Sequence, residues 1–371
     1  MLRSAAQSAH AWTVFLGVLA RYPFYRMGLT RRPMFTHHYE ESQRAWGQAT
    51  RWNARLRVVH PERCPRQHPA IFAGNHSKLD DPFFLWRAVN LASEGRMYCL
   101  FVMRDDWGRG PLWRLSPIRF NELGEMAGAV PISRGNVQYS QLKPLLQILQ
   151  EPGSFIIFPG RTRSRSGMVF EYREDVEEPG GISFFLAAGE RRMPGIRIPA
   201  VPVARTHNPV TWRSAVVFGE PMYLALGADR AAQRDFDFAL AVRVGELIEI
   251  NMLHLLSGLL YLRCLHGRST AWDLDALRRQ VRRVCEELPH PFLDPAARAR
   301  PEEEIMAVLR WLERRDCVTF RAGAIQPNAE RILSTPALEN SYRAANPVKY
   351  FVNQVMHLTA VVHLLEEVAL A

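Results

Sequence analysis

Short apolar runs separated by amphipathic stretches dominate the middle of the chain, from about residue 68 to residue 222. The runs have the length of buried strands, and the stretches between them carry apolar residues at helical spacing, bounded by Gly, Pro, Asn or Asp. Strands are predicted at Ala70–Ala73, Met97–Met103, Ala129–Ile132, Phe155–Phe158, Arg197–Ala204 and Ala215–Phe218, and helices at Pro82–Ala92, Asn136–Gln150 and Ile182–Ala188. Strands alternating with helices indicate an α/β domain with a largely parallel sheet.

Both ends of the chain lack this alternation and are predicted to be helical. Residues 1 to about 58 look amphipathic, with many aromatics and arginines, and after Tyr223 the strands stop. Later helices are predicted at Phe236–Leu265 (broken near Gly258), Asp273–Leu288, Glu302–Arg315 and Val348–Leu370, with a linker at Pro289–Pro301. The predicted fold class is therefore α/β, a mostly parallel sheet flanked by helices. It comprises an N-terminal amphipathic segment (1–60), the α/β domain (61–225) and a helical C-terminal region (226–371).

Composition and charge narrow the class of partner. The 371 residues have the apolar content of a folded globular protein and a net charge of +10. Such an excess suits an anionic partner: a phosphorylated small molecule, an anionic lipid surface or nucleic acid. The five cysteines show no C-x-x-C spacing, so neither structural zinc nor a disulfide framework is expected, which favours a reducing compartment. We expect no metal and no cofactor.

The N-terminal segment allows more than one interpretation. The apolar run Ala11–Ala20 is compatible with a signal peptide, whereas Arg21–Arg26 has the aromatic and basic mixture of a membrane interface. The run is also much shorter than the roughly 20 residues that span a bilayer. We expect peripheral attachment to the cytoplasmic face of a membrane; the alternatives are a cytoplasmic protein and helices that simply cap the core.

The segment Asn75–Pro82 carries the most informative chemistry. It is a polar turn between an apolar run and a predicted helix, and Asp81 before Pro82 is predicted to be the N-cap of that helix. A His at the strand exit and an Asp five residues later can meet across such a turn, whereas on one helix they would diverge. His76 and Asp81 are therefore a candidate general base and its orienting carboxylate, although Asp81 also has the simpler interpretation of a helix cap.

Three further predicted strands contain or lead into segments with reactive side chains or with proline. Gly128–Arg134 is a strand that ends in an arginine, and Phe158–Ser164 continues a buried strand into a loop of arginines and hydroxyls. Val201-Pro202-Val203 is a strand interrupted by proline. Because the loops at the carboxyl ends of parallel strands form the site of an α/β sheet, we expect these segments to lie near His76.

These four blocks, in this order, resemble those of the glycerolipid acyltransferases, which include lysophosphatidate and glycerol-3-phosphate acyltransferases. Asn75–Pro82 is similar to the family's N-H-x-x-x-x-D block and Phe158–Ser164 to its F-P-E-G-T-R-S block, and the resemblance covers about residues 68–222. There are two departures. Gly160 and Arg161 stand where many members have Glu-Gly, which puts the acceptor in question, and Lys78 stands where a Ser is frequent.

The resemblance implies an O-acyltransferase of phospholipid synthesis. It would move a fatty acyl group from a thioester, acyl-CoA or acyl carrier protein, to a hydroxyl of glycerol-3-phosphate or 1-acylglycerol-3-phosphate. His76 would be the base and Asp81 its partner. The acceptor phosphate is expected at Arg134, Gly160, Arg161, Thr162, Arg163 and Ser164, and an acyl groove at Val201 and Pro202. The expected partners are the donor, the phosphorylated acceptor and an anionic membrane surface, without nucleic acid.

Other chemistries find little support in the sequence. No P-loop Gly-Lys-Ser/Thr, Gly-x-Gly-x-x-Gly, Gly-x-Ser-x-Gly or His-Glu-x-x-His occurs. Two alternatives stay open. A non-catalytic basic protein that binds nucleic acid or anionic lipid would explain the charge but not the four ordered blocks. A relative that has lost activity through the change at Gly160 and Arg161 would serve as a membrane-associated scaffold.

Overall fold

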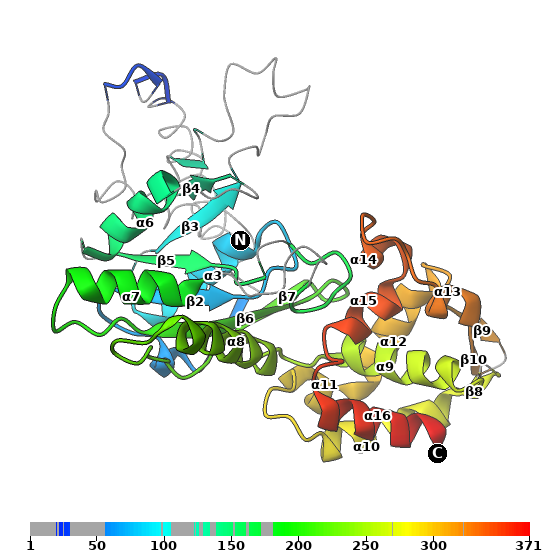
Figure 1. Ribbon diagram of the computed structural model, residues 1–371. Coiled ribbons are helices and arrows are strands. Elements are labelled where there is room, and N and C mark those ends of the chain that lie inside the picture. Colours follow the sequence, from blue (N-terminus) through cyan, green and yellow to red (C-terminus); the bar gives the residue numbers. More distant parts are fainter. Residues whose placement is uncertain are drawn as a thin grey trace.

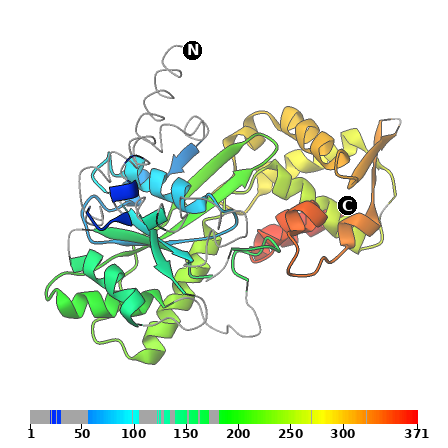
Figure 2. The same cartoon turned by 90° about the horizontal axis from the view of Figure 1, so that it is seen from above.

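The chain forms two lobes that lie side by side, an α/β lobe and a helical C-terminal lobe (Figures 1 and 2). The computed structural model describes residues 20–29, 56–104, 122–125, 129–133, 139–150, 153–160, 163–171 and 181–371, apart from residues 21, 25, 98, 123, 269 and 322. Most of the predicted N-terminal amphipathic segment lies outside these residues. Within them, no helix has the length and apolarity needed to cross a bilayer.

A seven-stranded sheet forms the centre of the α/β lobe, in the order β1-β7-β6-β2-β5-β3-β4. Its strands are β1 (Leu56–Val59), β2 (Ile71–Gly74), β3 (Cys99–Arg104), β4 (Ala129–Ile132), β5 (Ser154–Ile157), β6 (Ala200–Asn208) and β7 (Arg213–Phe218). Five of them, β2 to β6, run parallel, whereas β7 returns antiparallel to β6 and β1 pairs in parallel with β7. The predicted α/β class with a mostly parallel sheet is confirmed.

Helices cover both faces of this sheet. They are α3 (Asp81–Ala92), α6 (Tyr139–Gln150), α7 (Ile182–Arg192) and α8 (Arg230–Glu246). Successive side chains of a strand point to opposite faces, so Phe72 packs into the core beneath α3, while Ile71 and Ala73 face the core beneath α6, α7 and α8. The carboxyl ends of β2, β5 and β6 therefore meet at one edge of a well-packed sheet.

The C-terminal lobe is built around one buried helix, α9 (Met252–Leu265). The other elements are β8 (Trp272–Asp273), α10 (Leu274–Glu287), α11 (Pro295–Ala299), α12 (Pro301–Glu313), β9 (Val318–Arg321), β10 (Ala324–Pro327), α13 (Ala329–Leu333), α14 (Tyr342–Ala345), α15 (Pro347–Asn353) and α16 (Thr359–Leu370). A single apolar core runs from the α8 face of the sheet into this lobe. The two lobes are therefore packed together.

Two sequence predictions fail because strand pairing is decided by distant partners. Residues 56–59, assigned to the helical N-terminal segment, form β1, which is held by pairing with β7. Strands also continue beyond Tyr223, where none was predicted, because β8, β9 and β10 form a small antiparallel sheet. Short strands of this kind carry too little local pattern to be recognised alone.

The helix boundaries of the C-terminal region also differ from the prediction. The segment Phe236–Leu265 breaks before Asn251, whose side chain caps α9, and not at Gly258. Gly258 instead lets α16 approach α9, since a Cβ there would lie 2.7 Å from the Cδ1 atom of Leu365. Val348–Leu370 forms two helices, α15 and α16, and the predicted linker contains α11.

The loop formed by residues 163–171, the 163–171 loop, lies against the C-terminal lobe. The backbone N–H of Tyr342 donates to the carbonyl of Arg165 (3.0 Å), and the side-chain amide of Asn353 donates to the carbonyl of Ser166 (2.9 Å). The loop that begins with the predicted phosphate-binding residues Arg163 and Ser164 is therefore held, just after them, by segments almost 200 residues later in the chain.

We expect Gly167→Ala to destabilise the protein more than Gly195→Ala. Both glycines have positive φ (97° and 88°), a region that costs a side chain about 1–2 kcal/mol. At Gly167, however, a Cβ would also lie 2.0 Å from the carbonyl oxygen of Tyr350, whereas Gly195 has nothing within 4 Å. Denaturant unfolding measures both variants. Equal losses in the free energy of unfolding would contradict the close packing of the 163–171 loop on α15.

Candidate active site

The carboxyl end of β2 carries the candidate catalytic histidine. After Gly74, the side chain of Asn75 bonds both backbone groups of Arg205 in β6: Nδ2 donates to the carbonyl (2.9 Å) and Oδ1 accepts from the N–H (2.7 Å). The ring of His76 then stacks on Phe158 at the end of β5, with centroids 4.4 Å apart. Bonds to β6 thus hold the residue before His76, and the stacking on Phe158 positions its ring.

His76 and Asp81 meet across the turn, with Nδ1 of the ring 3.1 Å from Oδ2 of the carboxylate. An ionised carboxylate only accepts hydrogen bonds, so in the neutral ring the proton resides on Nδ1 and Nε2 keeps its lone pair. The His76 side chain is 19% exposed and the Asp81 side chain 0%. The arrangement is that of a general base whose orienting partner is buried.

Asp81 does not act as the N-cap of α3. The helix begins at Asp81, and Asp80 occupies the N-cap position without a side-chain cap. The carboxylate of Asp81 turns back into the loop, where Oδ2 accepts the backbone N–H groups of Ser77 and Lys78 at 2.6 Å each. The helix-cap prediction was therefore wrong, because this carboxylate finds its hydrogen-bond donors in the turn and the histidine ring.

Arg205 is a site residue that the sequence analysis missed. Its side chain is 1% exposed, and Nη1 contacts Oδ1 of Asp81 at 2.7 Å and Oδ1 of Asp80 at 2.8 Å. The guanidinium lies over the ring of Phe84, 3.6 Å from its centroid. Burial would raise the pKa of Asp80, but the hydrogen bond and charge of Arg205 outweigh it and lower that pKa. The available signal was an arginine directly after the predicted strand end at Ala204.

Besides Arg205, a second cation, Lys78, approaches the carboxylates of the turn. Its Nζ lies 3.7 Å from a carboxylate oxygen of Asp80. Burial lowers the pKa of Lys78 to about 8, although Asp80 opposes the shift. The positive charges of Arg205 and Arg343 add to it. Lys78 is therefore half protonated near pH 8.

The 163–171 loop is tied to the histidine and closed by a carboxylate. The backbone N–H of Ser164 donates to the carbonyl of His76 (2.7 Å). The hydroxyl of Ser164 donates to the carboxylate of Glu171 (3.2 Å). Glu171 also accepts the backbone N–H groups of Arg165 and Ser166. The hydroxyl of Ser164 is thus used within the loop, which argues against its predicted contact with a phosphate. Glu171, which the sequence analysis missed, gives the loop an acidic side chain.

The other predicted phosphate residues are only partly described. Gly160 lies in the turn after β5, and Arg163 is partly buried and forms no ion pair with any residue of the described ranges. Arg134, Arg161 and Thr162 lie outside those ranges. Of the predicted phosphate set, the structure therefore describes Gly160 in the turn after β5, and Arg163 directly before Ser164, whose backbone N–H bonds His76.

Val201 and Pro202 are core residues of β6. Val201 is fully buried in the core beneath α3. Pro202 packs closely on Gly219, since a Cβ added to Gly219 would lie 2.7 Å from the Cγ atom of Pro202. Since β6 lies between β7 and β2, both residues are enclosed by the sheet and its helices. Their burial argues against the predicted acyl groove at these positions.

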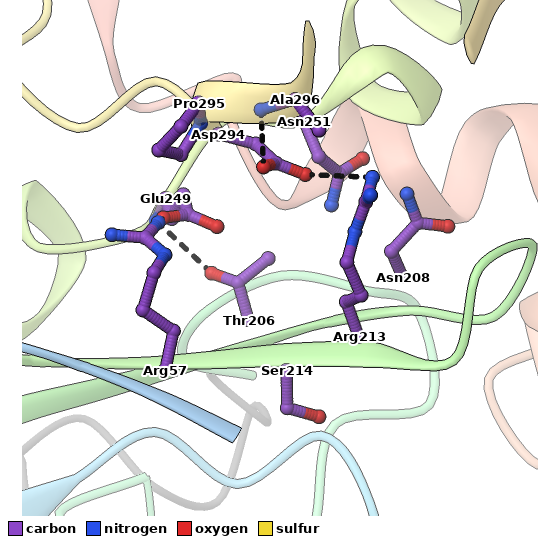
Figure 3. A pocket seen from close by; sticks show the side chains of 10 residues that line it. All are labelled: Arg57, Thr206, Asn208, Arg213, Ser214, Glu249, Asn251, Asp294, Pro295 and Ala296. Atoms are coloured by element: carbon purple, nitrogen blue, oxygen red, sulfur yellow. Dashed lines mark hydrogen bonds and ion pairs between the residues drawn. The ribbon is translucent and has the colours of Figure 1, made fainter. Parts of the chain in front are cut away.

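A cavity of about 190 Å³ lies between the lobes, over the ends of β6 and β7 (Figure 3). Two ion pairs line this cavity: Arg213 contacts the carboxylate of Asp294 at 3.2 Å, and Arg57 contacts the carboxylate of Glu249. Because these guanidinium groups already face carboxylates, the charges in the cavity neutralise one another. We interpret the cavity as part of the packing between the lobes. Within the described ranges, no three His, Cys, Asp or Glu side chains gather to hold a metal ion.

We expect Arg205→Met to destabilise the protein by about 3–5 kcal/mol, because it leaves the buried carboxylate of Asp81 without its arginine and Asp80 with Lys78 alone. Arg191→Met, at an exposed position of α7, is the matched control and is expected to have little effect. Denaturant unfolding at neutral pH measures both. The account of this ion cluster is contradicted when the two variants are equally stable.

Burial lowers the pKa of the Lys78 ammonium group to about 8. We therefore expect its reaction with an amine-selective acylating reagent to reach half of its maximal rate near pH 8. Peptide mass spectrometry across a pH series distinguishes it from Lys143 and Lys349, the other lysines of the chain. A rate for Lys78 that keeps rising beyond pH 10 would show that the ammonium is not buried beside other cations.

One comparison with known proteins, a match to a family model, agrees with this geometry. Residues 55–204 match the family model Acyltransferase, a span that begins at β1 and includes His76, Asp81 and the 163–171 loop. No curated protein matches the sequence. A solved structure, the 1-acyl-sn-glycerophosphate (LPA) acyltransferase PlsC from Thermotoga maritima, is 13% identical over 65% of this chain and 95% of that chain, with a TM-score of 0.36, and we draw no conclusion from it. The α/β lobe therefore carries an acyltransferase domain, which supports an acyltransferase activity for the chain.

Proposed function

We propose that the enzyme transfers a fatty acyl group from a thioester donor, acyl-CoA or acyl carrier protein, to a hydroxyl of a glycerol-phosphate acceptor in phospholipid synthesis. The acceptor is glycerol-3-phosphate or its 1-acyl form. The observation that carries the proposal is the His76–Asp81 pair at the end of β2, beside Lys78 and Arg163. Transfer to an alcohol needs a base for its proton, and cations suit a phosphate on the same molecule.

The mechanism follows from the tautomer of His76. Nε2 takes the proton of the acceptor hydroxyl as that oxygen attacks the thioester carbon, and Asp81 stabilises the imidazolium that forms. The tetrahedral intermediate then breaks its C–S bond, and the leaving thiolate takes the proton from the imidazolium. The products are the acylated acceptor, a free thiol and a neutral histidine. Because the nucleophile is the substrate hydroxyl, no acyl-enzyme forms.

Arg163 and Lys78 are the described side chains that we propose for the acceptor phosphate. A guanidinium presents paired donors that match two phosphate oxygens, and an ammonium adds a compact charge. Arg134, Arg161 and Thr162 remain candidates on the resemblance alone. Ser164 is not retained, because its hydroxyl bonds within the loop.

We also propose that the site works on the cytoplasmic face of a membrane with an anionic surface. Leu79, in the turn that carries His76, is 59% exposed, and Met168, in the 163–171 loop, is 45% exposed. Arg165 on the same loop is exposed as well. Apolar side chains next to basic ones are the pattern that favours contact with anionic lipid.

The proposed function is tested with purified protein, an acyl thioester and glycerol-3-phosphate or its 1-acyl form, with release of free thiol as the readout. His76→Ala is expected to lower turnover by about 100-fold or more, since a positioned general base contributes that much. His363→Ala, at an exposed position of α16, is the control and should leave turnover unchanged. Circular dichroism verifies that both variants are folded.

Unchanged turnover in the His76 variant would refute the catalytic assignment. Wild-type protein that binds DNA in a salt-dependent manner but transfers no acyl group would instead favour the non-catalytic basic protein. An inactive wild type that binds only membranes would favour the scaffold.

A further inference from the structure

Arg205 touches both ends of the turn that carries His76. At the start of the turn, the side chain of Asn75 bonds the backbone N–H and carbonyl of Arg205, at 2.7 and 2.9 Å. At its end, the guanidinium contacts the carboxylates of Asp80 and Asp81, at 2.8 and 2.7 Å. A single residue of β6 therefore brackets the turn, and His76 lies between the two points of attachment.

The two carboxylate oxygens of Asp81 have separate partners. Oδ1 accepts from Nη1 of Arg205. Oδ2 faces Nδ1 of the His76 ring and accepts two backbone N–H groups of the turn. Because a carboxylate is planar, a bond that fixes the direction of Oδ1 also fixes that of Oδ2. The guanidinium therefore sets the plane in which the ring of His76 finds its acceptor.

The guanidinium of Arg205 is itself held from several sides. Nη2 contacts the second carboxylate oxygen of Asp80 at 3.3 Å and the hydroxyl of Ser214 at 3.4 Å. The group also lies over the ring of Phe84, 3.6 Å from its centroid. A guanidinium presents its donors in a fixed fork, so these contacts leave it little freedom. Since the side chain is 1% exposed, it acts on a substrate only through its neighbours.

The composition of this cluster argues for positioning more than for stability. Burying an arginine with a carboxylate costs free energy that their attraction often only balances, and apolar side chains of similar size pack a strand and a helix at least as well. Here the ions lie directly beside the ring that the proposed reaction uses. The span matched by the family model ends at residue 204, directly before Arg205.

We propose that Arg205 is a positioning residue of the reaction: through Asp81 it holds the ring of His76 with Nδ1 protonated and Nε2 free for the acceptor hydroxyl. This inference rests on the proposed function and adds to it a residue that touches no substrate. The imidazolium then forms beside a carboxylate whose orientation is already fixed. Without the fork of Arg205, the carboxylate can rotate and the ring loses its single orientation.

The test compares arginine substitutions in two ion clusters of the same kind. Arg213 also contacts two carboxylates, those of Asp294 (3.2 Å) and Glu304 (2.7 Å), beside the cavity between the lobes. Substitution by Lys keeps a positive charge in either cluster but removes the fork. Arg205→Lys is therefore the test variant, and Arg213→Lys is its matched control.

Kinetics with an acyl thioester and glycerol-3-phosphate give the first readout. Arg205→Lys is expected to lower kcat about tenfold or more, the usual contribution of a hydrogen bond to a charged group. Arg205→Met, which also removes the charge, should lower it about 100-fold, as a misplaced catalytic group does. The KM values for both substrates should stay unchanged, and Arg213→Lys should keep the wild-type kcat. Denaturant unfolding identifies the folded variants, and Arg205→Lys decides the test where Arg205→Met does not fold.

Nitrogen-15 chemical shifts of the His76 ring give a second readout, which needs no turnover. In Arg205→Lys the ring is expected to exchange between its two neutral tautomers, whereas in Arg213→Lys it should keep the proton on Nδ1. Wild-type kcat and an unchanged ring in Arg205→Lys overturn the inference. An equal fall of kcat in both lysine variants overturns it as well, since it would reveal a purely structural role.

The outcome for Arg205 is distinguishable from that for the proposed function. A His76 tautomer that depends on Arg205, in a protein that releases no thiol, supports the positioning of the ring and contradicts the acyl transfer. Thiol release that is lost in His76→Ala but unchanged in Arg205→Lys contradicts the positioning role and leaves the catalytic assignment of His76 intact.

Discussion

The buried carboxylate of Asp81 holds in place the turn that carries His76. Its oxygens accept hydrogen bonds from four donors: the ring of His76, the backbone N–H groups of Ser77 and Lys78, and the guanidinium of Arg205. A buried charge is costly unless donors and a counter-charge satisfy it, and here one carboxylate links a turn, a helix start and a central strand. The histidine ring is therefore oriented by the fold itself, before any substrate binds.

This constraint extends from the sheet into the second lobe. Arg205 lies on β6, and the α8 face of the sheet shares one apolar core with α9 and its neighbours. The same lobe holds the 163–171 loop at Arg165 and, through Tyr350, touches the turn that carries His76. The C-terminal helices are thus a wall of the site. The α/β lobe that carries His76 and Asp81 is thus supported on one side by the C-terminal lobe.

Local patterns predicted the strands of the sheet and the contact between His76 and Asp81, because both depend on residues close in sequence. Apolar runs bounded by turn residues identified β2 to β7, and His76 and Asp81 are five positions apart. Contacts between distant segments were out of reach: Arg205 lies 124 residues from Asp81, and β1 forms only by pairing with β7. Asp81 shows how tertiary structure overrides a local rule, since an Asp before Pro82 fits a helix cap, yet its carboxylate turns to the histidine.

The most direct test of the central claim is the protonation state of the His76 ring in the free enzyme. Nitrogen-15 chemical shifts of ring-labelled histidines, with the His76 signals assigned by their loss in His76→Gln, report which ring nitrogen carries the proton. The account predicts a single neutral tautomer with the proton on Nδ1, bonded to Asp81, and a bare Nε2. A proton on Nε2, or a ring that exchanges between tautomers as free imidazole does, would contradict it.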